Sequence, residues 1–494
     1  MSTFGIDFGT TNCVVARYAA GTTDVLPLDQ PPPAWASAGL DRLLPSVVAV
    51  GPAGDVRFGW EAKLGADPRA EAVKRLFAAG DFMQFAGRSF PIEEIGALLF
   101  GRLRQLVAAP GGDLTRAVVT VPANSRGLAR YRTRLCARLA GIEAVVLVNE
   151  PAAAAMAFGV CAGDDQTVLV VDWGGGTLDV TVLELVDGVF LEHASKGVQR
   201  LGGLDFDSLV IEHLAGEVRG SYSWTEADRA ALRLEVERAK IRLSQHDEVA
   251  VALPGGDTRL LTRTEFERWV APLVQRASDP VRRCLADLGL PSSAVDHLVL
   301  VGGTCLMPAV REFVAEIVGR EPASGVDPLS AVAEGAAVAA AILAGEHPSD
   351  FFPATEHALG TVCLDAESMP TFDTIIPRNH KLPARGVAAY TPVRDYERSV
   401  QVQVVEGDPD VPLDHEDNLV LGTWTVPLEF RTATEATFDI TYEYDVDGLL
   451  HVQVVDRSTG KPLLDDSVSF LERLGPGLDV AELHARVAAA LAGA

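Results

Sequence analysis

The sequence predicts an α/β domain followed by an all-β sandwich and a short C-terminal helix. Short β-branched runs alternate with long helical patterns up to residue 345, and alternating runs without a long helix follow to about residue 471. An alanine-rich helical pattern ends the chain, whose 494 residues suffice for two to four domains of ~100–200 residues. We therefore expect domains over 1–345, 357–472 and 473–494, with a polar linker over 346–356.

In the first domain, short apolar runs predict buried strands and longer patterns with helical spacing predict helices. The strand runs are Phe4–Phe8, Ala117–Val121, Val145–Val148, Thr167–Asp172, Val180–Val186 and His297–Val301. The helix runs are Leu128–Ala140, Thr225–Ser244, Thr264–Leu288, Pro308–Val318 and Ala331–Leu343. Such alternation is typical of an α/β domain with largely buried strands.

In the second domain, alternation of apolar and polar residues predicts strands. The clearest runs are Ser399–Val405, Thr423–Leu428, Thr437–Tyr444 and Leu449–Asp456. The last two flank Asp447-Gly448, a typical hairpin turn, so we expect a sandwich of antiparallel strands. After it, Val480–Leu491 has the pattern of a short helix.

The composition excludes several classes of protein. With 68 acidic and 42 basic residues the net charge is −26, and a diffuse acidic surface repels nucleic acid and anionic membranes, so we expect neither as a partner. The longest apolar stretch, around 331–344, is shorter than the ~20 residues of a membrane span, and we expect no secretory signal. The six cysteines form no Cys-x-x-Cys pair, which indicates reduced thiols in a cytoplasmic protein.

A strand that ends in aspartate and runs into a turn of glycine and threonine occurs twice, around Asp7 and around Asp172. This near-repeat predicts two similar halves that face one another. Glycine lets backbone N–H groups close around a phosphate, and a carboxylate at a strand end suits hydrated Mg²⁺. The alternative is a pair of unrelated turns. The absence of a Gly-x4-Gly-Lys-Ser/Thr motif argues against a P-loop enzyme.

An ordered set of segments resembles the ATPase domain of the 70-kDa heat-shock chaperones of the DnaK type, within the actin and sugar-kinase superfamily. The segments are Gly5–Asn12, Val119–Ala123, Asn149–Ala154, Asp172–Asp179, Leu201–Asp207, Glu237–Lys240 and Val301–Gly303. Thr437–Ile440 and Asp447–Val452 likewise resemble the peptide-binding sandwich of that family. The resemblance implies a two-lobed, actin-like ATPase domain, then the sandwich, then a truncated helical lid.

The resemblance also implies a site for ATP or ADP with Mg²⁺ and, as a further candidate ion, K⁺. The catalytic candidates are Lys74, Glu150, Asp172, Thr177 and Asp179, and the metal candidates are Asp7 and Asp172. The cofactor-binding candidates are Gly9, Thr10, Thr11, Asn12, Gly174, Gly175, Gly176, Gly202, Gly203, Glu237, Lys240, Ser244, Gly302 and Gly303. An ammonium group such as that of Lys74 stabilises charge that develops on a phosphoryl group.

Several of these side chains have a structural alternative. Lys74 without its motif would be a solvated helix lysine, and Glu150 would be a carboxylate that favours a helix N-terminus. Glu237, Lys240 and Ser244 stand three and four residues apart, so they share one helix face. The family uses this face for ribose and adenine, whereas the alternative is an exposed face with salt bridges.

The chain departs from the family pattern at three places. Leu306 and Leu329 stand where the family has an arginine and an acidic residue beside adenine, which leaves the base preference open. Residues 350–357 contain two phenylalanines and a proline where the family has a leucine-rich linker, and proline removes a backbone donor. The lid is reduced to 477–493, so a bound peptide should dissociate faster.

The resemblance implies an ATP-hydrolysing chaperone of the stress response that binds extended, unfolded polypeptide through its sandwich. It also implies a J-domain co-chaperone, a nucleotide-exchange factor, and a role of Pro122 and Arg130 in signalling between domains. An alternative is a nucleotide-sensing scaffold with weak ATPase activity and one dedicated protein partner. A third reading is a small-molecule kinase of the same superfamily, which the sandwich opposes.

Overall fold

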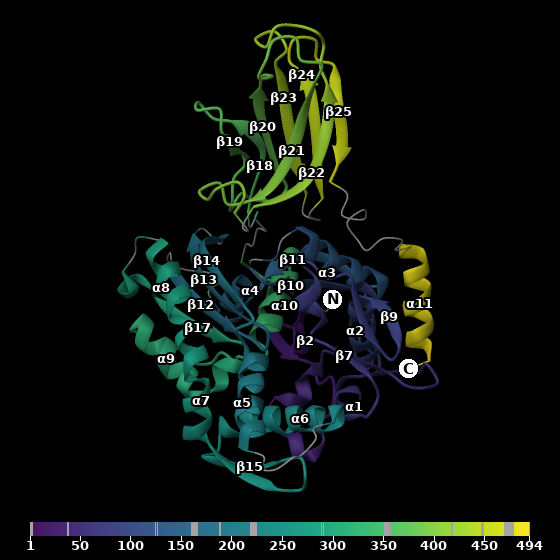
Figure 1. Cartoon of the computed structure of the whole chain (residues 1–494), viewed down its shortest axis with the longest axis vertical. Helices are drawn as coiled ribbons and strands as arrows, with labels where there is room; N and C mark the ends of the chain where they lie inside the picture. Colours follow the sequence, from purple (N-terminus) through teal and green to yellow (C-terminus); the bar gives the residue numbers. More distant parts are fainter. Residues whose placement is uncertain are drawn as a thin grey trace. The chain divides into compact units, whose positions relative to one another are not determined.

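The computed structural model describes residues 3–36, 39–123, 125, 127–159, 166–186, 189–217, 225–287, 289, 291–349, 355, 357–415, 418–445, 449–468 and 479–493. The chain separates into two compact units, each described by itself below (Figure 1). Residues 1–124, 132–351 and 478–494 form the first unit, and residues 125–131 and 352–477 form the second. Most of the predicted linker, at 350–354 and 356, and the start of the predicted lid, up to 478, lie outside the described residues.

Two sheets with the same strand arrangement form the centre of the first unit. One has the order β11-β10-β1-β2-β3, with β1 (Thr3–Phe8), β2 (Asn12–Ala19), β3 (Thr22–Val25), β10 (Arg116–Val121) and β11 (Glu143–Asn149); β4 (Leu44–Pro45) also pairs with β2. The other has the order β14-β13-β12-β17, with β12 (Gln166–Trp173), β13 (Thr177–Val186), β14 (Val189–Gln199) and β17 (His297–Val301). In each sheet a first strand, β1 or β12, lies between a parallel strand and an antiparallel hairpin partner. The sequence repeat is therefore a structural repeat.

Two alanine-rich helices join these sheets into one core. α4 (Glu150–Ala157) and α10 (Ala331–Leu343) belong to a single buried cluster that also contains Val14 of β2 and Val170 of β12. A Cβ atom on Gly335 of α10 would lie 1.6 Å from the carbonyl oxygen of Ala153, so the two helix backbones nearly touch. Small residues permit this approach, as they do wherever helices cross closely.

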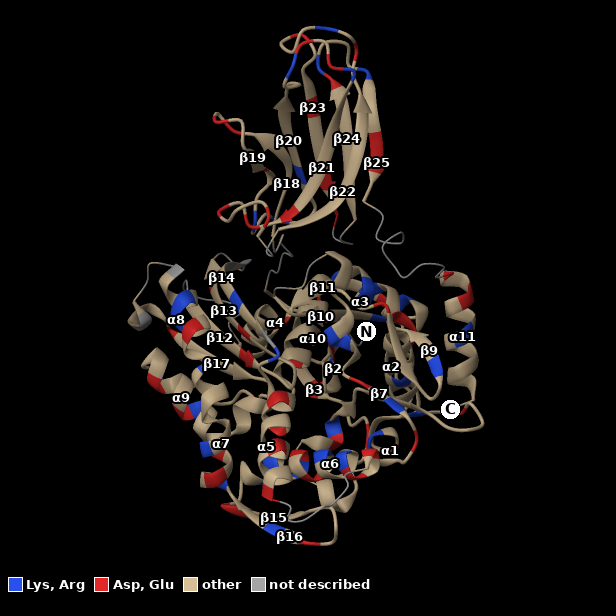
Figure 2. Cartoon of the chain, in the orientation of Figure 1, with Lys and Arg blue, Asp and Glu red and all other residues tan. Residues whose placement is uncertain are grey.

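Further elements surround this centre. The helices are α1 (Gly59–Leu64), η3 (Val73–Leu76), α2 (Ile92–Ala108), α3 (Gly127–Leu139), α5 (Gly203–Glu217), α6 (Glu226–Leu243), α7 (Arg263–Gln275), α8 (Ser278–Asp287), η5 (Gly303–Leu306) and α9 (Pro308–Val318). Small sheets comprise β5 (Val47–Val50), β6 (Val56–Phe58) and β7 (Arg69–Glu71); β8 (Phe82–Phe85) and β9 (Arg88–Pro91); and β15 (Glu248–Ala252) and β16 (Thr258–Thr262). Acidic and basic residues are interspersed along helices such as α6 and α7 (Figure 2). No helix within the described ranges combines the length and the apolar character needed to cross a membrane.

The predicted strands of the first domain are confirmed, and one helix prediction is wrong. The single helix expected over Thr264–Leu288 is two helices, α7 and α8. Pro280 explains the break, because its ring would clash with the carbonyl of Arg276 four residues earlier and it has no N–H to donate. Helices α2 and α5 were not among the predicted helices, although α2 carries apolar residues at helical spacing.

The C-terminal helix α11 (Val480–Ala492) belongs to the first unit. Its residues Leu483 and Val487 are buried, and Gln105 of α2 donates a hydrogen bond of 2.8 Å to the carbonyl of Leu491. Gly101 of α2 leaves room for Leu491, because a Cβ atom there would lie 2.2 Å from the Leu491 side chain. The short C-terminal helix expected within 473–494 is present, and its apolar stripe packs on α2; its part as a truncated lid stays a prediction.

The second unit is a sandwich of two antiparallel sheets. One sheet has the order β19-β18-β21-β22, with β18 (Ala358–Leu364), β19 (Pro370–Ile376), β21 (Ser399–Gly407) and β22 (Leu419–Pro427). The other has the order β20-β23-β24-β25, with β20 (Ala384–Tyr390), β23 (Phe438–Tyr444), β24 (Leu450–Asp456) and β25 (Pro462–Ser467). Alternate residues of β24, such as Val452 and Val454, are buried in the core between the sheets. The turn predicted at 446–448 lies outside the described residues, but the β23–β24 pairing that it joins is present.

We predict that Gly335→Ala lowers the free energy of unfolding of the first unit by about 3 kcal/mol, because an added methyl overlaps the backbone of α4. Hydrogen exchange at increasing urea concentration measures this change for each unit separately. Gly216→Ala in α5 is the matched control, since a Cβ atom there meets no atom within 4 Å. It should leave stability unchanged or raise it by up to ~1 kcal/mol. Equal effects of the two substitutions would contradict the close helix contact.

A second prediction concerns Asp456 of the sandwich. Burial alone would raise the pKa of this carboxyl, but hydrogen bonds from Ser458 and Thr459 outweigh it and lower the pKa to about 2. The ionised form therefore stabilises the fold above the ordinary pKa of about 4, and this stabilisation is lost as pH falls from 4 to 2. Asp456→Asn should destabilise the sandwich by about 1–3 kcal/mol at pH 7.

The difference between the Asp456→Asn variant and the parent should shrink steadily below pH 4 in acid-titrated unfolding curves. Asp414→Asn in the loop between β21 and β22 is the control, because that side chain is exposed. Its effect should stay within about 0.5 kcal/mol. A deficit at position 456 that persists unchanged at pH 2 would contradict the assignment.

Candidate functional site

The two repeated loops meet at one cavity of about 100 Å³ in the first unit. Its lining combines the β1–β2 turn, the β12–β13 turn, η3, and the starts of α4 and η5. The predicted site residues among its lining are Asp7, Gly9, Thr10, Thr11, Asn12, Lys74, Glu150, Asp172, Gly174, Gly175, Gly176, Thr177, Gly302 and Gly303. Residues from both halves of the repeat thus surround the same small volume.

Asp7 and Asp172 occupy matching positions near the ends of β1 and β12. Burial, reinforced by the charge of Glu150, raises the pKa of Asp7 to about 7. The same two causes raise the pKa of Asp172 well above its ordinary value. Buried carboxyl groups that repel one another in this way are stabilised by a cation between them.

Lys74 supplies one positive charge to this group. Its Nζ lies 2.6 Å from Oε1 of Glu150, and each of the two side chains is 10% exposed. Burial alone would lower the pKa of Lys74, but the carboxylates of Glu150 and Asp7 outweigh it and raise the pKa. Lys74 is therefore a buried, charged lysine rather than a solvated helix residue.

The glycines of the site stand where side chains would fill the space between the two halves. A Cβ atom on Gly175 would lie 1.9 Å from Oγ1 of Thr11, which comes from the opposite loop. A Cβ atom on Gly202 would lie 2.6 Å from the backbone of Gly175. The buried Thr11 Oγ1 has no hydrogen-bond partner among the residues that the structure describes. A phosphate would satisfy this hydroxyl, so the cradle fits an anion with oxygen acceptors.

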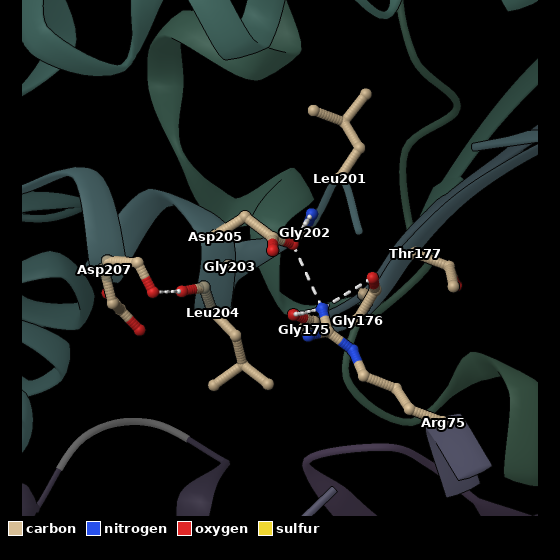
Figure 3. Close-up of polar contacts among 12 residues, drawn as sticks. Arg75, Gly175, Gly176, Thr177, Leu201, Gly202, Gly203, Leu204, Asp205 and Asp207 are labelled. Atoms are coloured by element: carbon tan, nitrogen blue, oxygen red, sulfur yellow. Dashed lines mark hydrogen bonds and ion pairs between the residues drawn. The ribbon is translucent and has the colours of Figure 1, made fainter. Parts of the chain in front are cut away.

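Arg75 is a residue of this site that the sequence analysis missed. Its guanidinium donates to the carbonyl of Gly176 at 2.7 Å and lies 3.0 Å from Asp205 (Figure 3). Asp205 in turn accepts the N–H of Gly202 at 2.9 Å. Arg75 therefore connects η3 of one half to both glycine segments of the other. The one feature of the sequence that could have identified Arg75 as a site residue is its position directly after Lys74.

The three residues predicted for ribose and adenine lie outside the 100 Å³ cavity. Glu237 accepts a 2.6 Å ion pair from Lys63, whose Nζ also lies 5.3 Å from the centre of the Trp35 ring. Lys240 lies 2.6 Å from Asp207, and the Ser244 hydroxyl donates to the carbonyl of Lys240. Both ion pairs are largely buried, so this helix face is not an exposed, salt-bridged surface.

The other predicted positions are also located. Gly203 and Thr304 donate hydrogen bonds of 3.1 and 2.8 Å to the carbonyl of Gly174, which anchors the β12–β13 turn. The hydroxyl of Thr177 donates to Asp179 at 3.0 Å, and Asp179 itself is buried behind the cavity lining. Leu329 lines the cavity, whereas Leu306 is 38% exposed. Pro122 also lines the cavity.

The donor set suits Mg²⁺ held mainly through water and phosphate. Among the described residues, no three histidine, cysteine, aspartate or glutamate side chains are arranged to bind a metal directly. Asp7 and Asp172 nevertheless line one cavity, and Mg²⁺ commonly takes one or two protein carboxylates together with phosphate oxygens and water. The residues present therefore fit this ion.

Most of the chain is similar to proteins of one known family. A family model described as Hsp70 protein matches residues 73–463. The chain is 34% identical over 491 residues to the chaperone protein DnaK of Thermotoga neapolitana, which covers 92% of this chain and 78% of the relative. For the DnaK proteins of Thermosipho africanus and Thermosipho melanesiensis the identities are 34% and 33%, with the same coverage. This protein is therefore a member of the Hsp70 family.

Proposed function

We propose that this protein is an ATP-dependent chaperone that hydrolyses ATP with Mg²⁺ and binds extended polypeptide segments through its sandwich. One observation carries the proposal: two glycine loops from a structural repeat, two buried carboxylates and a buried lysine surround a single cavity. Membership in the Hsp70 family and relatives named as DnaK chaperones support it.

In this proposal the two glycine loops hold the β- and γ-phosphates. Mg²⁺ would be held by Asp7 and Asp172 and would neutralise charge on the phosphates. Lys74 contributes a second positive charge where the transferred phosphoryl group develops negative charge, and Glu150 holds the lysine in that position. The Thr177 hydroxyl, whose proton is donated to Asp179 in this structure, would accept a hydrogen bond from the attacking water, or would donate to the γ-phosphate after release from Asp179. K⁺ remains a further candidate ion.

The cavity of about 100 Å³ between the loops is partly open and is smaller than a whole nucleotide. We infer that the two halves separate to admit ATP, and that Glu237, Lys240 and Ser244 then face its ribose and adenine. Leu329 on the cavity wall provides apolar contact rather than a charge near the base, so base selectivity should be modest.

The sandwich carries exposed apolar side chains that suit binding of polypeptide. Val393, Tyr396 and Phe430 are 67%, 51% and 63% exposed, and they lie in the loops after β20 and β22. Large apolar groups clustered at a surface often mark an interaction site. Main-chain hydrogen bonds would add affinity without sequence preference. A J-domain co-chaperone and a nucleotide-exchange factor are the partners that such a cycle requires.

A nucleotide-sensing scaffold with weak ATPase activity and one dedicated protein partner is the second candidate. Two observations favour it: Leu329 lines the cavity at a position where the family resemblance implies an acidic residue, and α11 packs on α2 of the first unit. In this second candidate, α11 is a structural helix of the first unit. The two candidates differ in turnover and in its response to peptide.

The deciding prediction is a peptide-stimulated, Lys74-dependent hydrolysis of ATP in single-turnover experiments. Lys74→Ala should lower the rate by about a hundredfold or more, since it removes a positioned charge from the transition state. Lys461→Ala, at an exposed lysine of the sandwich, is the control and should leave the rate unchanged. Tight nucleotide binding with little turnover and no effect of an unfolded apolar peptide would instead establish the scaffold.

A second prediction tests the phosphate cradle. Gly175→Ala should weaken binding of MgADP by at least about tenfold in calorimetry, because the new methyl overlaps Thr11 and displaces one loop from the other. Gly174→Ala is the matched control, because a Cβ atom at that position would lie 3.9 Å from its nearest neighbour. This substitution should weaken MgADP binding less than Gly175→Ala does. Equal losses at both positions would mean that contact between the loops does not shape the site.

A further inference from the structure

Arg132 of α3 is a fully buried charge that the proposed mechanism does not use. Its Nε lies 2.7 Å from Oε1 of Glu93, and a terminal nitrogen lies 3.0 Å from Oδ1 of Asp81. The other terminal nitrogen donates to the carbonyl of Phe77 at 2.9 Å. Arg132 is 0% exposed and Glu93 is 1% exposed, so the pair is removed from solvent.

This arginine reaches the segment that carries Lys74 and Arg75. Phe77 directly follows η3, and its N–H donates to the carbonyl of Lys74 at 3.1 Å. The Phe77 ring stacks on Phe8, with 5.8 Å between ring centres, and Phe8 stands between Asp7 and Gly9 of the first phosphate loop. Through one residue, Arg132 is therefore connected both to η3 and to the β1–β2 turn.

Stability alone gives little reason for this arrangement. Removing a guanidinium and a carboxylate from water is costly, and apolar residues of similar volume often stabilise a core as well or better. A guanidinium has instead a planar set of donors with fixed directions, and here three partners occupy them: two on the stretch that follows η3 and one on α2. Such an arrangement fixes geometry.

We propose that Arg132 is a positioning residue, which holds η3, and with it Lys74 and Arg75, in register with the two glycine loops. A lysine could pair with Glu93 but could not also reach Asp81 and the Phe77 carbonyl. The predicted effect of Arg132 on hydrolysis rests on the proposed ATPase function. The predicted effect of Arg132 on the position of η3 is independent of that function.

Arg132→Lys tests the proposal in the full chain, with two readouts. Hydrogen exchange without nucleotide should show about tenfold faster exchange in residues 73–81, since the backbone anchor at Phe77 is lost. Single-turnover hydrolysis should fall about ten- to a hundredfold through misplacement of Lys74. Affinity for MgADP, which lacks the γ-phosphate, should change less than about threefold.

Arg486→Lys is the matched control, because it weakens an ion pair with Glu94, the residue next to Glu93, on the side of α2 that faces α11. It should leave both readouts unchanged. Unchanged exchange at 73–81 in Arg132→Lys, or equal changes in the two variants, would overturn the proposal. Should Arg132→Lys not fold, Asp81→Ala removes the more exposed partner, 46% accessible, and should shift both readouts in the same direction. If the parent protein shows no ATP turnover, the proposed ATPase function is wrong. The hydrogen-exchange result at residues 73–81 then still decides whether Arg132 positions η3.

Discussion

The contact between α4 and α10 is the constraint on which the rest of the first unit depends. Gly335 lies against the backbone of Ala153, and a Cβ atom on Gly5 of β1 would lie 2.2 Å from the backbone nitrogen of Ala337 in α10. Because both helices present only small residues here, the two repeated sheets come close enough for their loops to meet. Thr11 and Gly175 then touch across the repeat, and Glu150 at the start of α4 reaches Lys74. Core packing thus assembles the site.

Burial at that meeting point sets the electrostatics. Two carboxyl groups, Asp7 and Asp172, have raised pKa values because solvent is excluded and Glu150 is near. The same exclusion strengthens the attraction that keeps Lys74 charged. Such a site suits a cation bound together with a phosphate, because the cation neutralises the carboxylates and the negative charge of the phosphate. The packing that brings the two loops together therefore also shifts the pKa values of the site.

Two adjacent carboxylates in the first turn of α2 form ion pairs with different segments of the first unit. Glu93 pairs with Arg132 and so with the segment behind η3, whereas Glu94 pairs with Arg486 of the C-terminal helix. The chain leaves the first unit for the sandwich and returns to it in α11. In sequence, residues 352–477 of the second unit therefore lie between two stretches of the first unit.

The sequence by itself determined the α/β and sandwich patterns, the repeat, and the cavity-lining residues of the two loops, because alternation, glycine loops and strand-end aspartates are local signals. Lys74 and Glu150 followed only from the family resemblance. It did not determine the break at Pro280 within an otherwise helical pattern, nor the role of Arg75, whose partners lie a hundred or more residues away. The partners of Glu237 and Lys240, and the packing of α11 on α2, were likewise decided only in the folded chain. The physical reason is the same in each case: a side chain's charge is known from its identity, but its burial and its partner depend on which distant segment packs against it.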